Sequence, residues 1–319
     1  MTDSAELVGS DYRMMKVLEL IDAVADSRAT VLITGESGTG KSLVARAIHQ
    51  RSARRDKPFV EVACGALPET LLESELFGHV RGAFTDAAGD RPGKFAAAEG
   101  GTIFLDEIST ASPGLQTKLL RVLQERSFEP VGSNQVRSAD VRVIVATNGD
   151  LSAEVAAGTF RRDLYYRVNV VNIALPPLRD RLGDIGLLAE HFLRRYSREN
   201  AKPIAGFTEE GLHALRRYDW PGNIRELENC VERAVVLCRG GRIGADDLPD
   251  EVAGRTAAGE NNVRGQAAAT TLAESLSAAE RQAIRAALAV CGGNRKAAAG
   301  RLGIDRTTLY KKMRKRGLT

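Results

Sequence analysis

Apolar and polar positions follow two different periods along the first 175 residues of the chain. Short runs of β-branched and apolar residues, typical of buried strands, fall at 30–34, 59–62, 102–105 and 141–146. Between these runs, apolar residues recur at helical spacing, as in 14–25, 43–51, 68–77 and 115–124. Strands that alternate with helices predict an α/β fold, in which helices flank a parallel sheet with right-handed crossovers.

The pattern changes after Leu175-Pro176-Pro177, which breaks the chain. Apolar residues then follow only the helical period, as in 185–193 and 227–235, which predicts a small helical lid. The next segment is rich in Ala, Gly, Asn, Thr and Arg without an apolar period, which is typical of a flexible linker. The predicted division is an α/β domain in 1–177, the lid in 178–250, the linker in 251–271 and a last unit in 272–319.

The last unit has the pattern of an all-α helix-turn-helix domain. Gly292-Gly293 ends one helix, Asn294 can cap the next, Gly303 makes a sharp turn, and Asp305 can cap a final helix. The final helix is expected to bury two apolar side chains, Leu309 and Met313. Its expected DNA-binding residues are Arg306, Thr307, Thr308, Lys311, Lys312 and Arg314. A basic helix that is merely solvated is the alternative.

Composition and charge agree with this division. The 319 residues are 43% apolar and 27% charged, as in ordinary globular proteins. The net charge of +4 hides an asymmetry, because residues 281–319 hold eleven Lys and Arg against a single acid, Asp305, and the rest holds 34 basic and 40 acidic residues. A mildly acidic body with a strongly basic end predicts double-stranded DNA as the partner of that end.

Cysteine spacing and hydropathy exclude several other classes. The four cysteines show no CxxC spacing, so neither a zinc site nor a disulfide framework is indicated. No apolar stretch reaches 18 residues, and the first twenty residues lack a signal-peptide pattern. We therefore expect a cytoplasmic protein with no membrane insertion. Because little chain precedes the first helix, we expect no regulatory domain at the N-terminus.

Residues 35–42 follow the first strand and fit G-x-x-x-x-G-K-[ST], the phosphate-binding loop. Glycines let the backbone approach a polyphosphate, which the loop N–H groups and the following helix N-terminus bind. Lys41 supplies a charge to the β- and γ-phosphates, and Ser42 a hydroxyl to Mg²⁺. The expected nucleotide-binding residues are Gly35, Glu36, Ser37, Gly38, Thr39, Gly40, Lys41 and Ser42. The strand–loop–helix context disfavours the alternative of an ordinary Gly-rich turn.

Polar residues also end two other predicted strands, Asp106-Glu107 after 102–105 and Thr147-Asn148 after 141–146. The carboxyl ends of parallel strands share one edge of the sheet, where ligands bind. We therefore expect Asp106 to hold Mg²⁺, Glu107 to activate the attacking water and Asn148 to face the γ-phosphate. ATP and Mg²⁺ are the expected cofactors.

Three other features each allow two interpretations. Phe84 lies in the Gly-rich segment 78–93, which predicts a long functional loop, and either contacts a partner or folds back onto the domain. Arginines are concentrated in 160–167, where one could reach the γ-phosphate of a neighbouring subunit or all could lie on a solvated helix face. Arg225, one turn into a helix, faces the nucleotide or pairs with an acid.

Taken together, these motifs resemble the sigma-54-dependent transcriptional activators, also called bacterial enhancer-binding proteins, which are hexameric AAA+ ATPases. The resemblance covers residues 7 to about 245 and, separately, a Fis-type DNA-binding domain in 272–319. Its signatures are the phosphate loop, Glu75-Leu-Phe-Gly78, Gly82-Ala-Phe-Thr-Asp-Ala87, Gly101-Thr-Ile-Phe-Leu-Asp-Glu107, Phe160-Arg161 and Trp220-Pro-Gly-Asn-Ile-Arg225. It implies sigma-54 contact for Phe84 and Thr85, sensor I for Thr147 and Asn148, trans-acting arginine fingers for Arg161 and Arg167, and sensor II for Arg225.

Three positions depart from the family pattern. The family loop usually reads GAFTGA, whereas Asp86 replaces its second Gly, adding a charge and restricting φ. Ala63 stands where the family has an Asn that restrains the Walker B glutamate, and it cannot make that hydrogen bond. In the second pore loop, Pro130 replaces the usual Arg before Val-Gly. None of the three positions touches the nucleotide directly.

The resemblance implies an ATP-dependent transcriptional activator that binds upstream DNA and remodels the closed complex of sigma-54 RNA polymerase. A hexamer of this chain, the sigma-54 holoenzyme and upstream DNA are the implied partners, with a trans-acting regulator as in the phage-shock and Hrp-type activators. One alternative is a DNA-binding regulator or repressor with a AAA+ body that no longer remodels sigma-54. The other is a AAA+ motor that acts on a different substrate.

Overall fold

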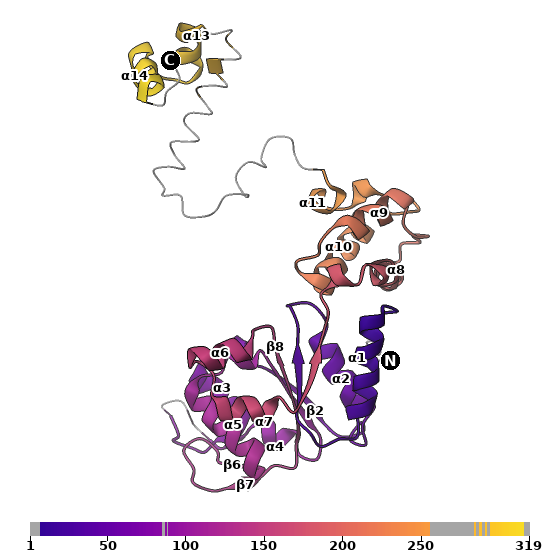
Figure 1. The fold of residues 1–319 in the computed structure, drawn as a ribbon, viewed down its shortest axis with the longest axis vertical. Helices are drawn as coiled ribbons and strands as arrows, with labels where there is room; N and C mark the ends of the chain where they lie inside the picture. Colours follow the sequence, from indigo (N-terminus) through magenta and orange to yellow (C-terminus); the bar gives the residue numbers. More distant parts are fainter. Residues whose placement is uncertain are drawn as a thin grey trace. The chain divides into compact units, whose positions relative to one another are not determined.

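The computed structural model describes residues 7–84, 87, 89–255, 284, 287, 288, 291 and 294–315, with side chains up to Met313 in the last segment. The chain forms two compact units that divide after Arg255 (Figure 1). Thr85, Asp86, the Arg314 side chain and the predicted linker beyond Arg255 lie outside the described residues. None of the helices in the described segments is long and apolar enough to cross a membrane.

A five-stranded parallel sheet forms the centre of the first unit, in the order β2-β5-β8-β1-β9. Its strands are β1 (Val31–Thr34), β2 (Phe59–Ala63), β5 (Thr102–Asp106), β8 (Arg142–Thr147) and β9 (Val171–Ala174). The first four confirm the predicted strands. The edge strand β9 was not predicted, because its four residues alternate between buried and exposed and follow a helix without a turn signal.

Helices cover both faces of this sheet (Figure 1). They are α1 (Tyr12–Val24), α2 (Lys41–Gln50), α3 (Glu69–Phe77), α4 (Lys94–Ala97), α5 (Pro113–Glu125), α6 (Leu151–Ala157) and α7 (Arg162–Val168). Successive residues of a strand face opposite sides. Val31 and Ile33 accordingly pack in one core with α1 and α2, and Leu32 packs in the other core with α3 and α5.

Two antiparallel pairs of short strands extend from the α3–α5 side. They are β3 (Gly78–His79) with β4 (Arg91–Pro92), and β6 (Ser127–Phe128) with β7 (Arg137–Ser138). The Gly-rich segment 78–93 therefore has strands at both ends, which its irregular sequence did not predict. The two loops contact each other, because Val80 N donates to Val131 O and Val131 N to Gly78 O. Pro130 does not disturb these bonds, since its neighbour supplies both groups.

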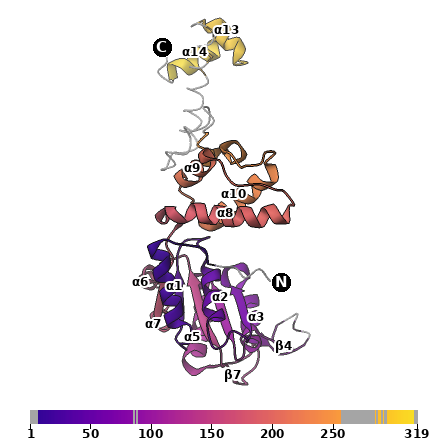
Figure 2. The same ribbon diagram turned by 90° about the vertical axis from the view of Figure 1, so that its right-hand side faces the viewer.

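The lid consists of α8 (Leu182–Glu199), α9 (Glu209–Arg217), α10 (Asn223–Leu237) and α11 (Asp250–Ala253), and lies above the sheet (Figure 2). Trp220 is fully buried in its core and donates to Leu215 O. Val252 is buried in the same core, and Arg255 pairs with Asp246 and Asp250. Residues 251–255 thus pack with the lid, although the sequence assigned them to the linker. Short 3₁₀ turns lie at Cys64–Ala66, Ile108–Thr110, Leu178–Asp180 and Ala245–Asp247.

The second unit contains α13 (Arg295–Arg301) and α14 (Arg306–Lys315), joined by a turn at Gly303, whose φ is 65°. Asn294 caps α13, as predicted, by accepting from the backbone N–H groups of Lys296 and Ala297. The predicted apolar side chains of α14, Leu309 and Met313, are buried against Ile284, Ala287, Ala298 and Ala299. These helices form the predicted helix-turn-helix.

Candidate functional site

The phosphate loop joins β1 to α2 at the carboxyl edge of the sheet. Gly38 and Gly40 have φ values of 79° and 98°, which residues with a Cβ rarely adopt. A Cβ on Gly38 would lie 2.2 Å from the Gly222 carbonyl oxygen of the lid. Only glycine therefore lets the loop pass this close to the lid. Because Gly40 caps α2, the first N–H groups of a ten-residue helix face the loop.

Lys41 is largely buried at the start of α2. Its Nζ donates to Gly35 O at 2.8 Å and to Glu36 O at 3.0 Å, so the ammonium lies across the mouth of the loop. Burial lowers the pKa of Lys41, while the charges of Asp106 and Glu107 act to raise it. The ammonium therefore lies within electrostatic reach of both acids, but it donates only to backbone carbonyls, and a phosphate would provide a direct ionic partner.

A cavity of about 270 Å³ unites most of the predicted nucleotide residues, although Gly35, Glu36 and Thr39 do not line it. It is lined by Lys41 and Ser42 of the loop, Asp106 and Glu107 at the end of β5, and Arg225 of α10. Arg225 also donates from Nη1 to Ser37 Oγ at 3.1 Å. The fold thus brings residues from three distant segments around one hollow. Its position at the carboxyl ends of parallel strands is the usual ligand position in such sheets.

The acid and hydroxyl in this cavity suit Mg²⁺. Ser42 and Asp106 offer the hard oxygen ligands that Mg²⁺ prefers, and both line the cavity. Across the described residues, no group of three or more His, Cys, Asp or Glu forms a metal site. An ion held by only one or two protein oxygens and by nucleotide phosphates matches this arrangement.

Glu107 has a left-handed backbone conformation, with φ of 57°. A Cβ on Gly65 would lie 2.7 Å from Glu107 Oε2, so the carboxylate lies directly over that glycine. Ala63 is paired in register with Asp106 and has no polar side-chain atom. Within the described residues, no group donates a hydrogen bond to the Glu107 carboxylate. The restraint that an asparagine would provide at position 63 is therefore missing, as expected.

The lid is tied to the phosphate loop by a cluster that the sequence did not indicate. Arg179 donates two hydrogen bonds to the Glu36 carboxylate, and Asn223 Nδ2 donates to Glu36 Oε2 at 3.1 Å and to Ser37 O at 3.0 Å. These bonds lower the pKa of Glu36 to about 2. At the start of α10, Ile224 N donates to Gly38 O at 2.9 Å. The lid thus contacts the loop at three successive residues.

Asn223 is the centre of this cluster. Its side chain is fully buried, its φ is 54°, and its Oδ1 accepts from the N–H of Leu178 at 2.8 Å. The side chain of Asn223, at the start of α10, is therefore hydrogen-bonded both to the phosphate loop and to Leu178, in the segment after β9. The available signal was the Pro-Gly-Asn sequence before a helix, because Asn tolerates a left-handed backbone. Two residues later, the same helix positions Arg225.

Three other predicted residues lie outside the cavity. Asn148 is exposed at the end of β8, while the adjacent Thr147 is buried and accepts from Gly149 N. Arg161 is exposed and forms a salt bridge with Asp163. Arg167, also exposed, donates to the carbonyl oxygen of Leu123 near the end of α5. The fold of a single chain therefore does not bring either arginine to its own nucleotide cavity.

Phe84 combines features of both interpretations of its loop. Its ring packs edge-to-face against His79, with 4.9 Å between centroids, yet the residue remains 37% exposed. The loop is closed by hydrogen bonds from Ala87 N to Phe84 O and from Gly82 N to Ala87 O. The ring of Phe84 thus packs on His79 and is also accessible at the surface.

The predicted DNA-binding residues of α14 differ in their exposure to solvent. Arg306, Thr307 and Lys311 are exposed, whereas Thr308 and Lys312 are half-buried. The Thr308 hydroxyl and N–H both donate to Asp305, which lowers the pKa of this acid to about 2. Thr308 therefore helps Asp305 to cap the helix, a role that the sequence analysis did not assign to it.

Tyr310 contacts two arginines, Arg295 of α13 and Arg306 of α14. The Arg295 and Arg306 guanidiniums lie 4.9 and 5.9 Å from the centre of its ring, and Arg295 donates to its hydroxyl at 2.6 Å. This contact lowers the pKa of Tyr310. The sequence analysis missed Tyr310, although an aromatic residue one turn after Arg306 was a visible signal.

A parallel sheet with a phosphate loop, an acidic strand end beside it and a helical lid that contacts the loop defines the class of AAA+ P-loop NTPases. Comparison with known proteins specifies the family. The sequence matches the Sigma-54 interaction domain over residues 7–174, the AAA+ ATPase lid domain over residues 179–264 and the Fis family of bacterial regulatory proteins over residues 275–315. The chain belongs to the family of sigma-54-dependent transcriptional activators and is an ATP-dependent activator of this class.

Individual relatives agree with this assignment. The transcriptional regulatory protein ZraR of Salmonella typhi is 53% identical over 307 residues, which cover 96% of this chain and 68% of ZraR. The regulatory protein AtoC of Escherichia coli is 47% identical over 305 residues, covering 96% of this chain and 66% of AtoC. The structure of NtrX from Brucella abortus in complex with ATP has a TM-score of 0.76 at 34% identity and covers 98% of this chain and 69% of that chain.

Proposed function

We propose that this chain hydrolyses ATP in the cavity between the phosphate loop and the lid. Lys41 and the loop N–H groups bind the β- and γ-phosphates, where their charge also stabilises the transition state. Ser42 and Asp106 would hold Mg²⁺, which neutralises phosphate charge when it is bound. Glu107 orients the attacking water and accepts its proton. The shared cavity of these four residues supports this assignment.

We further propose that catalysis is completed between subunits of a hexamer. Arg161 is exposed, lies outside the cavity of its own chain and would exchange its contacts with Asp163 and Thr117 for a phosphate. An arginine finger supplied in trans contributes about 10³–10⁵ in rate in other NTPases. Arg167, which already binds the Leu123 carbonyl, would supply a second guanidinium only if that contact opened. Asn148 would sense the γ-phosphate from the neighbouring strand end.

We propose that the contacts of the lid change when the bound nucleotide is hydrolysed. Arg225 lines the cavity, and Asn223, two residues earlier, is bonded to the backbone of the phosphate loop. Any movement of the loop on hydrolysis therefore changes contacts at the start of α10. The same change would alter the position of Phe84 and Thr85, the proposed contact with sigma-54.

The second unit is proposed to bind upstream DNA in the cytoplasm. Arg306 and Thr307 at the start of α14 would contact base edges, and Lys311, Lys312 and Arg314 the phosphates. The described helix-turn-helix and the excess of basic residues in 281–319 support this role. We propose that residues 1–177 form the nucleotide-binding domain, residues 178–250 the lid and residues 272–319 the DNA-binding domain.

Open-complex formation tests this proposal directly. The assay combines the purified full chain, sigma-54 holoenzyme, a sigma-54 promoter and ATP. We expect open complexes from the wild type, loss with Phe84→Ala despite normal ATP turnover, and retention with Tyr12→Ala, which removes an exposed ring on α1. ATP turnover without open complexes from the wild type would instead support a regulator that no longer remodels sigma-54, the alternative that Ala63 and Asp86 favour.

A further inference from the structure

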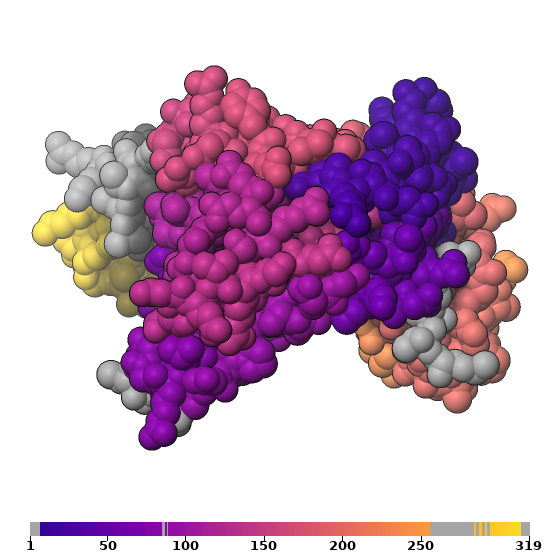
Figure 3. All heavy atoms as spheres, turned by 90° about the horizontal axis from the view of Figure 1, so that it is seen from below, coloured from indigo at the N-terminus to yellow at the C-terminus, as the bar shows by residue number. Residues whose placement is uncertain are grey.

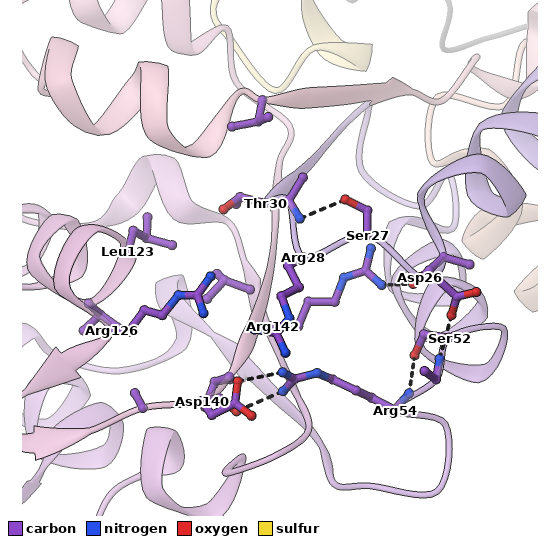
Figure 4. Close-up of a pocket in the computed structure, with 18 of the residues that line it drawn as sticks. Asp26, Ser27, Arg28, Thr30, Ser52, Arg54, Leu123, Arg126, Asp140 and Arg142 are labelled. Carbon is purple, nitrogen blue, oxygen red and sulfur yellow. Dashed lines mark hydrogen bonds and ion pairs between the residues drawn. The ribbon is translucent and has the colours of Figure 1, made fainter.

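A second polar cavity lies at the opposite end of the sheet from the phosphate loop. Figure 3 views this end of the first unit from below, where segments from indigo to magenta meet. The cavity, of about 360 Å³, is formed by the segments that follow α1, α2 and α5, by the start of β8 and by the end of α7. Figure 4 shows its polar side chains converging from these separate segments.

The charges around this cavity are unbalanced. Its charged lining residues are Arg28, Arg54, Arg126, Arg142, Arg167, Asp26 and Asp140. Five guanidiniums against two carboxylates leave an excess of three positive charges. Such a concave basic surface attracts anions, because low-dielectric walls concentrate the field.

Both carboxylates already have partners. Asp140 accepts from Arg54 at 2.7 Å, and Asp26 accepts from the N–H of Ala53 at 2.8 Å. By contrast, the side chains of Arg28 and Arg126 form no hydrogen bond or ion pair with any described residue. Both nevertheless lower the pKa of Asp140 through their charge, after the larger effect of Arg54. Two unpaired guanidiniums therefore lie close to the same carboxylate.

Two details of the backbone and core direct these side chains inward. Arg126 has φ of 51° at the end of α5, a conformation that is costly for a residue with a Cβ, and Figure 4 shows its side chain pointing toward Arg28 and Arg142. Arg142 is only 4% exposed, and its terminal nitrogens donate to the carbonyls of Val24 and Ala25. Its Nε is buried without any acceptor among the described residues. Because this nitrogen is buried and the other two are bonded to carbonyls, Arg142 contributes charge to the cavity wall and no free donor.

We propose that this cavity is a binding site for a polyvalent phosphate anion, held chiefly by Arg28 and Arg126, while the buried Arg142 adds positive charge to its wall. Guanidiniums bind phosphate oxygens in pairs, and an excess of three charges favours an anion with several charges over a single carboxylate. The site is distinct from the nucleotide cavity, since none of its lining residues belongs to the phosphate loop, β5 or the lid.

Calorimetric titration with inorganic pyrophosphate, without Mg²⁺, tests the proposal. The full chain carries Lys41→Ala, so that binding at the phosphate loop is weakened. We expect one bound pyrophosphate and at least tenfold weaker affinity after adding Arg28→Ala with Arg126→Ala, because each removes a charge-assisted bond. Citrate, a carboxylate of similar charge, is expected to bind at least tenfold more weakly than pyrophosphate. Equal affinity for citrate would overturn the assignment to phosphate.

The matched control is Arg306→Ala with Lys311→Ala, which removes the same two charges from the basic second unit. We expect the control to change pyrophosphate affinity by less than twofold. Unchanged binding in the Arg28 and Arg126 variant, or equal losses in both variants, would overturn the site. If the double alanine variant melts early, Arg28→Lys with Arg126→Lys replaces it, and is expected to bind between wild type and alanine, since the charge stays and the paired geometry is lost.

Discussion

The two ends of the central sheet offer two different solutions to binding phosphate. At the carboxyl end, one continuous segment of eight residues supplies backbone N–H groups, a helix N-terminus and a single lysine. At the amino end, arginines from five separate segments face a cavity, and no glycine-rich loop is involved. The carboxyl end relies on backbone geometry, the amino end on side-chain charge.

The lid adds a second difference. The carboxyl end is covered by an element that binds the loop through Asn223 and Arg179, so its contacts can respond to the nucleotide. The charged groups at the amino end lie mostly in segments that follow the flanking helices, and Arg54 and Arg142 bind backbone carbonyl groups of the same unit. We therefore expect the largest effects of changes at the carboxyl end on ATP turnover or affinity, and those of changes at the amino end on stability and anion affinity.

The largest expected effect separates chemistry from binding at the carboxyl end. Glu107→Gln removes the proposed general base, so kcat for ATP should fall by about 10²–10⁴. Affinity for ATP, measured by equilibrium binding of a fluorescent analogue, should change by less than threefold. Glu125→Gln, at the exposed end of α5, serves as the control and should retain full turnover. A fall of less than tenfold with Glu107→Gln would remove Glu107 from the proposed mechanism.

The second prediction concerns stability at the amino end. Arg142→Ala leaves the Val24 and Ala25 carbonyls at the end of α1 without their buried donor. An unsatisfied buried group costs about 1–3 kcal/mol, so we expect the free energy of unfolding to fall by about 2–4 kcal/mol in urea titrations. Arg28→Ala, an exposed neighbour without hydrogen bonds, should change it by less than about 0.5 kcal/mol. Equal effects of the two variants would contradict a structural role for Arg142.

The same contrast explains what the sequence could predict. Four strands were predicted correctly because their apolar runs are contiguous, and the phosphate loop could be recognised because its eight residues are contiguous too. Asp106, Glu107 and Arg225 were grouped with the loop through the rule on strand ends and a family resemblance, and they line one cavity. The hexamer, the arginine fingers and the contact with sigma-54 remain proposals.

The parts that were missed have two physical causes. The edge strand β9 has only four residues, one of them buried, so it carries little periodic signal. The Glu36–Arg179–Asn223 cluster joins segments that are up to 187 residues apart, and the amino-end cavity joins five segments. Arginines occur throughout the chain, so only tertiary structure reveals which ones converge.

The third prediction tests whether the lid tunes nucleotide affinity. Asn223→Ala removes three hydrogen bonds and adds strain at φ of 54°, whereas Asn223→Gly removes the bonds without the strain. We expect KM for ATP to rise by about tenfold in both variants, with kcat changed less than threefold, because the lid holds the loop and the chemistry lies at Glu107. The matched control is Asn200→Ala, at the exposed end of α8, which should leave both constants unchanged. A fall in kcat without a rise in KM would contradict this role.

The smallest expected effect is the pH dependence of the contact between the lid and the loop. Hydrogen bonds from Arg179 and Asn223 lower the pKa of Glu36 from its ordinary value of 4.5 to about 2. A carboxyl whose pKa is lowered by folding stabilises the protein above the ordinary pKa, and this contribution is lost as the pH falls from about 4.5 toward 2. Because the pair is partly exposed, we expect at most about 1 kcal/mol.

The measurement is the difference in the free energy of unfolding between wild type and Glu36→Gln at several pH values. It should be constant above pH 5 and shrink toward zero near pH 2. In an Arg179→Ala background the difference should be smaller at neutral pH, because the carboxylate has lost its paired donor. A difference that stays constant down to pH 2, or that is unaffected by Arg179→Ala, would show that the charge of Glu36 does not hold the lid against the loop.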